Sequence, residues 1–123
     1  DGLSMSVGSA LAEANFVIFG NNNDDTGTTS SSLSGISKRS KREWNFDEKG
    51  TVTADVKIDI SDATGHSGSI SAASNYKLLF KTCEFCNFLE LETGDSASGD
   101  VITFSNVTIQ DGIFCIASAD SNL

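Results

Sequence analysis

Three cysteines are the residues of this 123-residue chain whose type and spacing allow the most specific chemistry. Cys83 and Cys86 form a C-x-x-C pair, and Cys115 stands apart from them. Zinc needs four ligands, which a third cysteine and a single histidine do not supply at a recognisable spacing. A redox C-x-x-C belongs at a helix start in a βαβ context, which this sequence lacks. We therefore predict a disulfide formed in an oxidising compartment, joining Cys83 to Cys86 or one of them to Cys115, with reduced thiols as the alternative.

A calcium-like pattern lies in the asparagine- and aspartate-rich stretch that follows the second predicted strand. Asn22, Asp24 and Thr26 occupy positions 1, 3 and 5 of an EF-hand loop, and Gly27 occupies position 6. Leu33 stands where the loop would need its bidentate acid, so this is not an EF-hand. The pattern predicts a weaker calcium site completed by a remote acid, and a polar loop without a metal is the alternative. We expect no other cofactor.

Catalytic constellations find little support. The one histidine, His66, lies between glycines in a T-G-H-S-G run that does not match the G-x-S-x-G nucleophile motif. Acidic residues such as Asp55 and Asp59 alternate along a predicted strand, where they form a solvated face. We therefore predict no catalytic and no cofactor-binding residues.

Charge and length narrow the class of protein further. The net charge is −9 and the isoelectric point about 4.3, which argues against binding to nucleic acid or to anionic membrane surfaces. No run of 18 apolar residues exists, so direct membrane insertion is not expected. The chain starts at Asp1 without a basic leader, which suggests a mature product or a piece of a longer protein. Its length suits a single domain over 1–123.

The elements that must position these residues are short strands joined by polar turns. Residues 52–60 alternate strictly between apolar and polar side chains, which indicates an antiparallel strand with one wet face. Long polar loops are expected at 20–35 and 61–75, and a polar tail at 119–123. Further strands are predicted at 3–7, 14–19, 76–81, 87–92, 101–105 and 112–118. The sequence therefore predicts an all-β fold, an antiparallel immunoglobulin-like or jelly-roll-like β-sandwich of about eight short strands, in which Trp44 is buried against Val56 and Ile58.

The runs GISKRSKREWNFDEKGTVTADVKIDIS, NYKLLFK and GDVITFSNVTIQDGIFCIAS carry a family resemblance. Together they resemble the β-sandwich module that recurs in large surface proteins of Bacteroidetes and related bacteria. The pattern departs from that module in its C-x-x-C and in its basic KRSKR run. The matching positions are Arg42, Trp44, Glu48, Gly50, Val52 to Ile60, Tyr76 to Leu79, Asp111 and Gly112.

The resemblance implies surface display and a structural or adhesive role without catalysis. It also implies an O-glycosylation site at Ser96, in the Asp-Ser-Ala turn. The alternating Leu3, Met5 and Val7 suit the addition of a strand to a neighbouring sheet edge. We therefore expect a secreted or cell-surface structural or adhesive module that assembles with neighbouring copies, as a fibre or a tandem array. The alternative is a module that binds surface glycans and is attached to a secreted enzyme.

Overall fold

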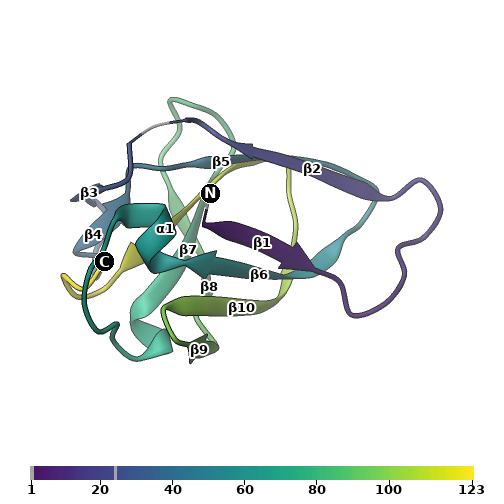
Figure 1. The fold of residues 1–123 in the computed structure, drawn as a ribbon. Coiled ribbons are helices and arrows are strands. Elements are labelled where there is room, and N and C mark those ends of the chain that lie inside the picture. The colour runs from purple at the N-terminus through teal and green to yellow at the C-terminus, as the bar shows by residue number, and fades with distance from the viewer. Residues whose placement is uncertain (1, 24) are drawn as a thin grey trace.

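The computed structural model describes residues 2–23 and 25–123, which form two antiparallel sheets in a sandwich-like arrangement (Figure 1). The all-β sandwich predicted from the sequence is confirmed. The described residues contain eleven strands rather than about eight. Two of the additional strands, Thr28–Ser30 and Ser96–Ser98, lie in segments whose polarity had favoured a loop and a turn.

The smaller sheet presents its apolar face to the core through strict alternation. One of its two inner strands, β6 (Thr53–Asp59), places Ala54, Val56 and Ile58 inward, each at most 2% exposed, as the period of two requires. A bulge interrupts the next strand between Phe104 and Val107, where Asn106 adopts a positive φ. In spatial order the strands are β1 (Leu3–Ser6), β6 (Thr53–Asp59), β10 (Val101–Thr108) and β9 (Ser96–Ser98).

The larger sheet is organised around β11 (Gly112–Ser118). One edge of β11 pairs along almost its whole length with β7 (Tyr76–Lys81), which in turn pairs with β8 (Leu89–Thr93). The other edge pairs first with β5 (Trp44–Lys49) and then with β4 (Lys38–Ser40). The outermost strands on that side are β2 (Phe16–Asn21), beside β5, and β3 (Thr28–Ser30), beside β4.

Four phenylalanines form a row of rings across the larger sheet. Ring centroids are 5.5 Å apart for Phe19 and Phe46, 4.3 Å for Phe46 and Phe114, and 5.0 Å for Phe114 and Phe80. The row thus runs from β7 through β11 and β5 to β2, and its last member, Phe19, is 38% exposed. Such contacts are favourable beyond their area burial, so the core extends to the β2 edge and ends there incompletely covered.

Trp44 is fully buried in the same core cluster as Val56 and Ile58, as predicted. The segments expected to be loops contain three regular elements in addition to β3: a helix α1 (Ile60–Thr64), a 3-10 turn η1 (Ala73–Asn75) and, at the predicted turn after β8, strand β9. Helix α1 begins where the Asp59 carboxylate accepts a hydrogen bond from the Asp62 N–H and ends at Gly65, whose φ is 73°.

The C-terminal segment is packed rather than a free polar tail. Leu123 is only 5% exposed, and the Tyr76 hydroxyl donates to the Asn122 carbonyl oxygen at 2.8 Å. The polarity of this segment had favoured a tail, because the sequence does not show which distant groups form hydrogen bonds with it.

Candidate interaction surfaces

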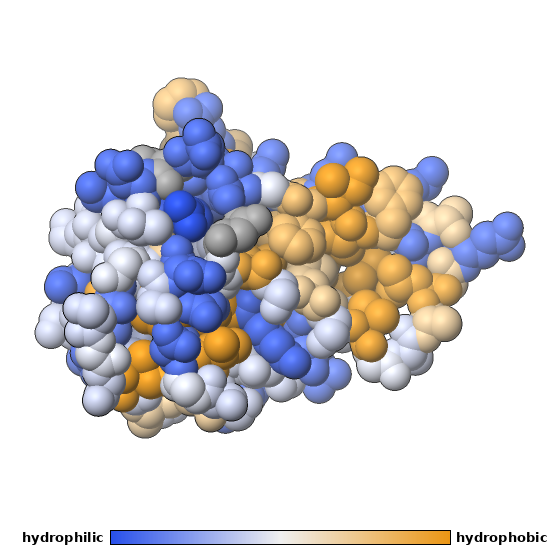
Figure 2. All heavy atoms as spheres, in the orientation of Figure 1, coloured by the Kyte–Doolittle hydropathy of each residue, from blue (hydrophilic) through white to orange (hydrophobic). Residues whose placement is uncertain are grey.

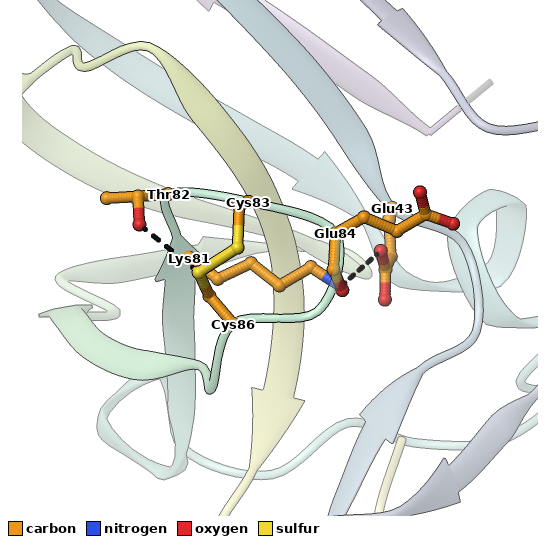
Figure 3. Close-up of a disulfide and its surroundings, with 6 residues drawn as sticks. All are labelled: Glu43, Lys81, Thr82, Cys83, Glu84 and Cys86. Atoms are coloured by element: carbon orange, nitrogen blue, oxygen red, sulfur yellow. Dashed lines mark hydrogen bonds and ion pairs between the residues drawn. A yellow bond between two sulfur atoms is a disulfide. The ribbon is translucent and has the colours of Figure 1, made fainter.

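A disulfide joins Cys83 to Cys86 in the turn between β7 and β8, so the predicted pairing within the C-x-x-C is confirmed (Figure 3). The turn also contains a hydrogen bond from the Cys86 N–H to the Cys83 carbonyl oxygen at 3.1 Å. The alternative partner, Cys115, is buried in β11 and unpaired. Burial raises the pKa of the Cys115 thiol to about 12, so that thiol stays neutral.

Beside this turn, two cations share one carboxylate on the outer face of the larger sheet. Arg39 Nη1 lies 3.0 Å from Glu43 Oε1, and Lys81 Nζ lies 3.0 Å from Glu43 Oε2. The ring of Phe88 lies near both cations, 5.0 Å from the guanidinium carbon of Arg39 and 4.5 Å from Lys81 Nζ. The cluster therefore carries a formal charge of +1 in a chain whose net charge is −9.

Arg39, Lys81 and Phe88 line a groove of about 420 Å³ between the segment after β3 and the disulfide turn. Ser31 and Ser32 line one side of the groove, and Phe85 and Asn87 line the other. Phe85 is 94% exposed, more than any other large apolar side chain among the described residues. The groove thus combines hydroxyl and amide groups, an aromatic ring and a cation, which are the groups that orient small polar ligands.

A second surface is apolar and lies at the β2 edge (Figure 2). The orange region in Figure 2 covers β2 and the connection from β1 to β2, which projects from the end of the sandwich in Figure 1. The exposed large apolar side chains gathered there are Val7, Leu11, Phe16, Ile18 and Phe19. We call these five residues the apolar edge.

Strand β2 has the composition of an interior strand although it lies at an edge. Val17 and Phe19 face the core, and Ile18, which is 63% exposed, projects from the opposite face. Among the described residues β2 pairs with β5 alone, so its other side presents unpaired backbone groups. Natural edge strands are commonly protected by charges or proline, and the β2 sequence FVIFGN contains neither. The β8 strand, in contrast, contains Glu90 and Glu92.

The residues predicted to mediate assembly are placed within their own sheet. Leu3 is 9% exposed and lies opposite Ile58, and Met5 packs against the core opposite Val56. Val7 follows the strand and belongs to the apolar edge. The first strand therefore pairs with β6 of the same chain, and exchange of this strand between copies stays a prediction.

The predicted calcium site cannot be assembled from the described residues, because Asp24 lies outside them. The Asn22 side-chain oxygen accepts a hydrogen bond from the Glu43 N–H at 3.2 Å. Thr26 lies near Gly65. Among residues 2–23 and 25–123, no three histidine, cysteine, aspartate or glutamate side chains come together to hold a metal ion.

The remaining predicted positions lie apart from both surfaces. Ser96 is exposed on β9, opposite Thr103. His66 follows helix α1, and its Nε2 atom is buried without a hydrogen-bond partner in the described part of the chain. No helix there is long and apolar enough to cross a membrane.

Sequence reasoning missed both the groove and the apolar edge. The groove residues Ser31, Arg39 and Lys81 come from three segments that lie far apart in the sequence, and no local pattern connects these segments. The edge had a usable signal, since ANFVIF is apolar on both faces and uncharged. That signal predicts burial on both sides, but it does not reveal that the strand lies at the margin.

Residues 4–113 match the model of a family described as a domain of unknown function (DUF8202). No curated protein and no solved structure matches the chain significantly.

Proposed function

The chain belongs to the DUF8202 family of unknown function, and from this premise we propose that it is a non-catalytic structural module of a secreted or cell-surface protein. In this proposal, copies of the module associate through the apolar edge. The observation that carries the proposal is that β2 has apolar side chains on both faces and no charge, yet lies at the margin of its sheet.

The occupant we propose for this edge is a second copy of the chain. Two uncharged β2 strands from different copies can approach each other without charge repulsion, whereas the acidic surfaces of two copies repel each other. Between residues 2 and 23, Glu13 is the one charged side chain, although the whole chain has 17 acidic and 8 basic residues. Self-association is therefore least opposed at this edge.

Antiparallel pairing of β2 with β2 of a second copy satisfies backbone groups on both strands. This pairing joins the larger sheet of one copy to the larger sheet of the other. It also brings Phe19, the exposed end of the aromatic row in each copy, toward the partner. A contact of this kind is isologous and closes as a dimer. A longer fibre would then need modules that are linked in tandem or exchange their first strands.

A secreted or surface location is supported by the disulfide on the exposed turn, since such bonds persist in oxidising compartments. The resemblance to repeated surface modules favours the same location. Glycosylation at Ser96 belongs to this proposal, because the serine is exposed on β9.

Analytical ultracentrifugation of the isolated chain tests the proposal. We expect a reversible dimer at high micromolar concentration, and a monomer for Ile18→Lys, which places a charge on the exposed face of β2. Leu89→Lys is the matched control, since Leu89 is 65% exposed on β8 and should not affect the dimer. A wild-type chain that stays monomeric, or a dimer that is insensitive to Ile18→Lys, would contradict edge pairing; the latter result would favour exchange of β1.

A further inference from the structure

The groove beside the disulfide turn points to a ligand that the self-association of copies does not explain. We propose that this groove binds a glycan through a sugar that carries a carboxylate, such as a uronic or sialic acid. The inference depends on Arg39, Lys81, Phe85 and the serines of the groove, and it does not depend on the apolar edge.

Lys81 is the fixed part of the cation cluster. Its side chain is 8% exposed, and Nζ contacts Glu43 Oε2 at 3.0 Å and the Glu84 carbonyl oxygen at 3.2 Å, with the Phe88 ring 4.5 Å away. Three neighbours match the three protons of an ammonium group. Lys81 therefore positions Glu43 and has no donor left for a ligand.

Arg39 retains donors that the cluster does not use. Its Nη1 donates to the Ser40 carbonyl oxygen and to Glu43 Oε1, each at 3.0 Å. The Cys115 thiol beneath the cluster forms a further side-chain hydrogen bond with Arg39, and 24% of the Arg39 side chain is exposed where it lines the groove. A guanidinium group has five N–H donors, and the two that these three hydrogen bonds leave can bind a carboxylate.

Two acidic groups lie beside the two cations of the groove. Glu43 is bound to both Arg39 and Lys81, and its side chain is 16% exposed. Glu84 contributes its carbonyl oxygen to Lys81, while its carboxylate points away from the ammonium group (Figure 3). Cys115, beneath the cluster, is a neutral thiol. Two cations and two carboxylates therefore balance, so the groove is formally neutral in a chain whose net charge is −9.

The rest of the groove fits a sugar rather than a simple anion. Phe85, held at the tip of the disulfide turn, offers an exposed ring for the apolar face of a pyranose. Ser31, Ser32 and Asn87 offer hydroxyl and amide groups for its hydroxyls. The groove volume of about 420 Å³ lies in the range of small-ligand sites.

The experiment is a binding assay against a panel of oligosaccharides that end in galacturonic, glucuronic, mannuronic or sialic acid, each paired with its methyl ester. We expect at least one acid to bind. The affinity of its methyl ester should be lower by about tenfold or more, and a tenfold loss corresponds to about 1.4 kcal/mol of binding free energy. Phe85→Ala and Arg39→Gln should each weaken binding about tenfold or more. Leu89→Ala, outside the groove, is the control and should bind as the wild type does.

Phe85→Ala is the sharper variant because the ring is exposed and its removal leaves the fold intact; thermal unfolding verifies folding for Arg39→Gln. A panel with no member bound more tightly than its ester would overturn the proposal. So would an acid that binds equally to wild type and Phe85→Ala. Neither result bears on the dimer, which sedimentation of the same samples measures separately.

Discussion

Trp44 occupies the centre of the core with no exposed surface, and its indole N–H has no hydrogen-bond partner among the described residues. The residue therefore stabilises the fold by filling volume, against the cost of one buried unpaired donor. At the same scale, the buried Cys115 and the exposed disulfide show how the environment, rather than the residue type, decides reactivity.

We expect Trp44→Ala to reduce the free energy of unfolding by about 3–5 kcal/mol, because a large cavity remains in a packed core. Trp44→Phe should cost less, since it keeps an aromatic ring and removes the unpaired donor. Urea unfolding of the three proteins measures both differences. A tryptophan emission maximum typical of full exposure in the native protein would contradict the burial on which this prediction depends.

The cysteines should respond to alkylation in a fixed order. At pH 8 the folded protein should take up no iodoacetamide, since Cys83 and Cys86 are bonded and Cys115 is buried with its pKa raised to about 12. After mild reduction two thiols should react, and the third only after unfolding. Intact mass measures each step, and labelling of Cys115 in the folded, unreduced chain would show that the prediction is wrong.

At the scale of elements, the C-terminal segment 119–123 is attached by a carboxylate that accepts four hydrogen bonds. Asp120 Oδ2 accepts from the Ser71 hydroxyl at 2.6 Å and from Asn75 Nδ2 at 3.2 Å. Its Oδ1 accepts from the Ser118 hydroxyl at 2.7 Å and from the Asn122 N–H at 2.9 Å. One side chain thus connects the end of the chain to the loop before β7.

Asp120 makes this attachment dependent on pH. The hydrogen bond from Ser71, together with those from Ser118, Asn122 and Asn75, lowers the pKa of Asp120 below its ordinary value of 3.8. A lowered folded pKa contributes stability that is fully present above 3.8 and is lost as the pH falls through the folded value. The segment should therefore loosen in acid.

Asp120→Asn should reduce stability at pH 7 by about 1.5–3 kcal/mol, the range for hydrogen bonds to a charged group. It should also flatten the loss of stability below pH 4, because the variant has no carboxylate to protonate there. Thermal unfolding between pH 7 and pH 3 measures both effects. Glu92→Gln, exposed on β8, is the control; an identical acid response in wild type and Asp120→Asn would contradict the assignment.

For the whole molecule, charge is distributed so that the two proposed contacts respond oppositely to salt. The net charge of −9 repels two copies over their entire surfaces, while the apolar edge itself is uncharged. Salt screens that repulsion, and it also screens the attraction between Arg39 and a carboxylate.

We therefore expect the dimer to strengthen as NaCl is raised from about 50 to about 500 mM. Over this range the Debye length shortens to the order of a few Å. Over the same range, binding of an acidic glycan should weaken. Sedimentation and calorimetric titration of one preparation measure the two responses. If both contacts changed in the same direction, the assignment of one as apolar and the other as ionic would fail.

The sequence by itself determined what depends on near neighbours along the chain. Alternation over 52–60 predicted the wet and dry faces of β6, because side chains of a strand point to opposite faces at every step. Trp44 alternates in the same way with Arg42 and Phe46, which predicted its place in the core, where it is fully buried. The Cys83–Cys86 pairing was among the predicted options, because two intervening residues permit a turn that brings the sulfurs together.

Only the tertiary structure decided which strand lies at an edge and which distant groups meet. β2 is apolar on both faces, as an interior strand would be, and its marginal position follows from the pairing order of the whole sheet. Arg39, Glu43 and Lys81 converge because β4 and β7 pair with opposite sides of β11. The Asp120 hydrogen bonds likewise span up to 49 positions. Pairing order and such contacts depend on the packing of the entire chain, which local patterns of polarity do not encode.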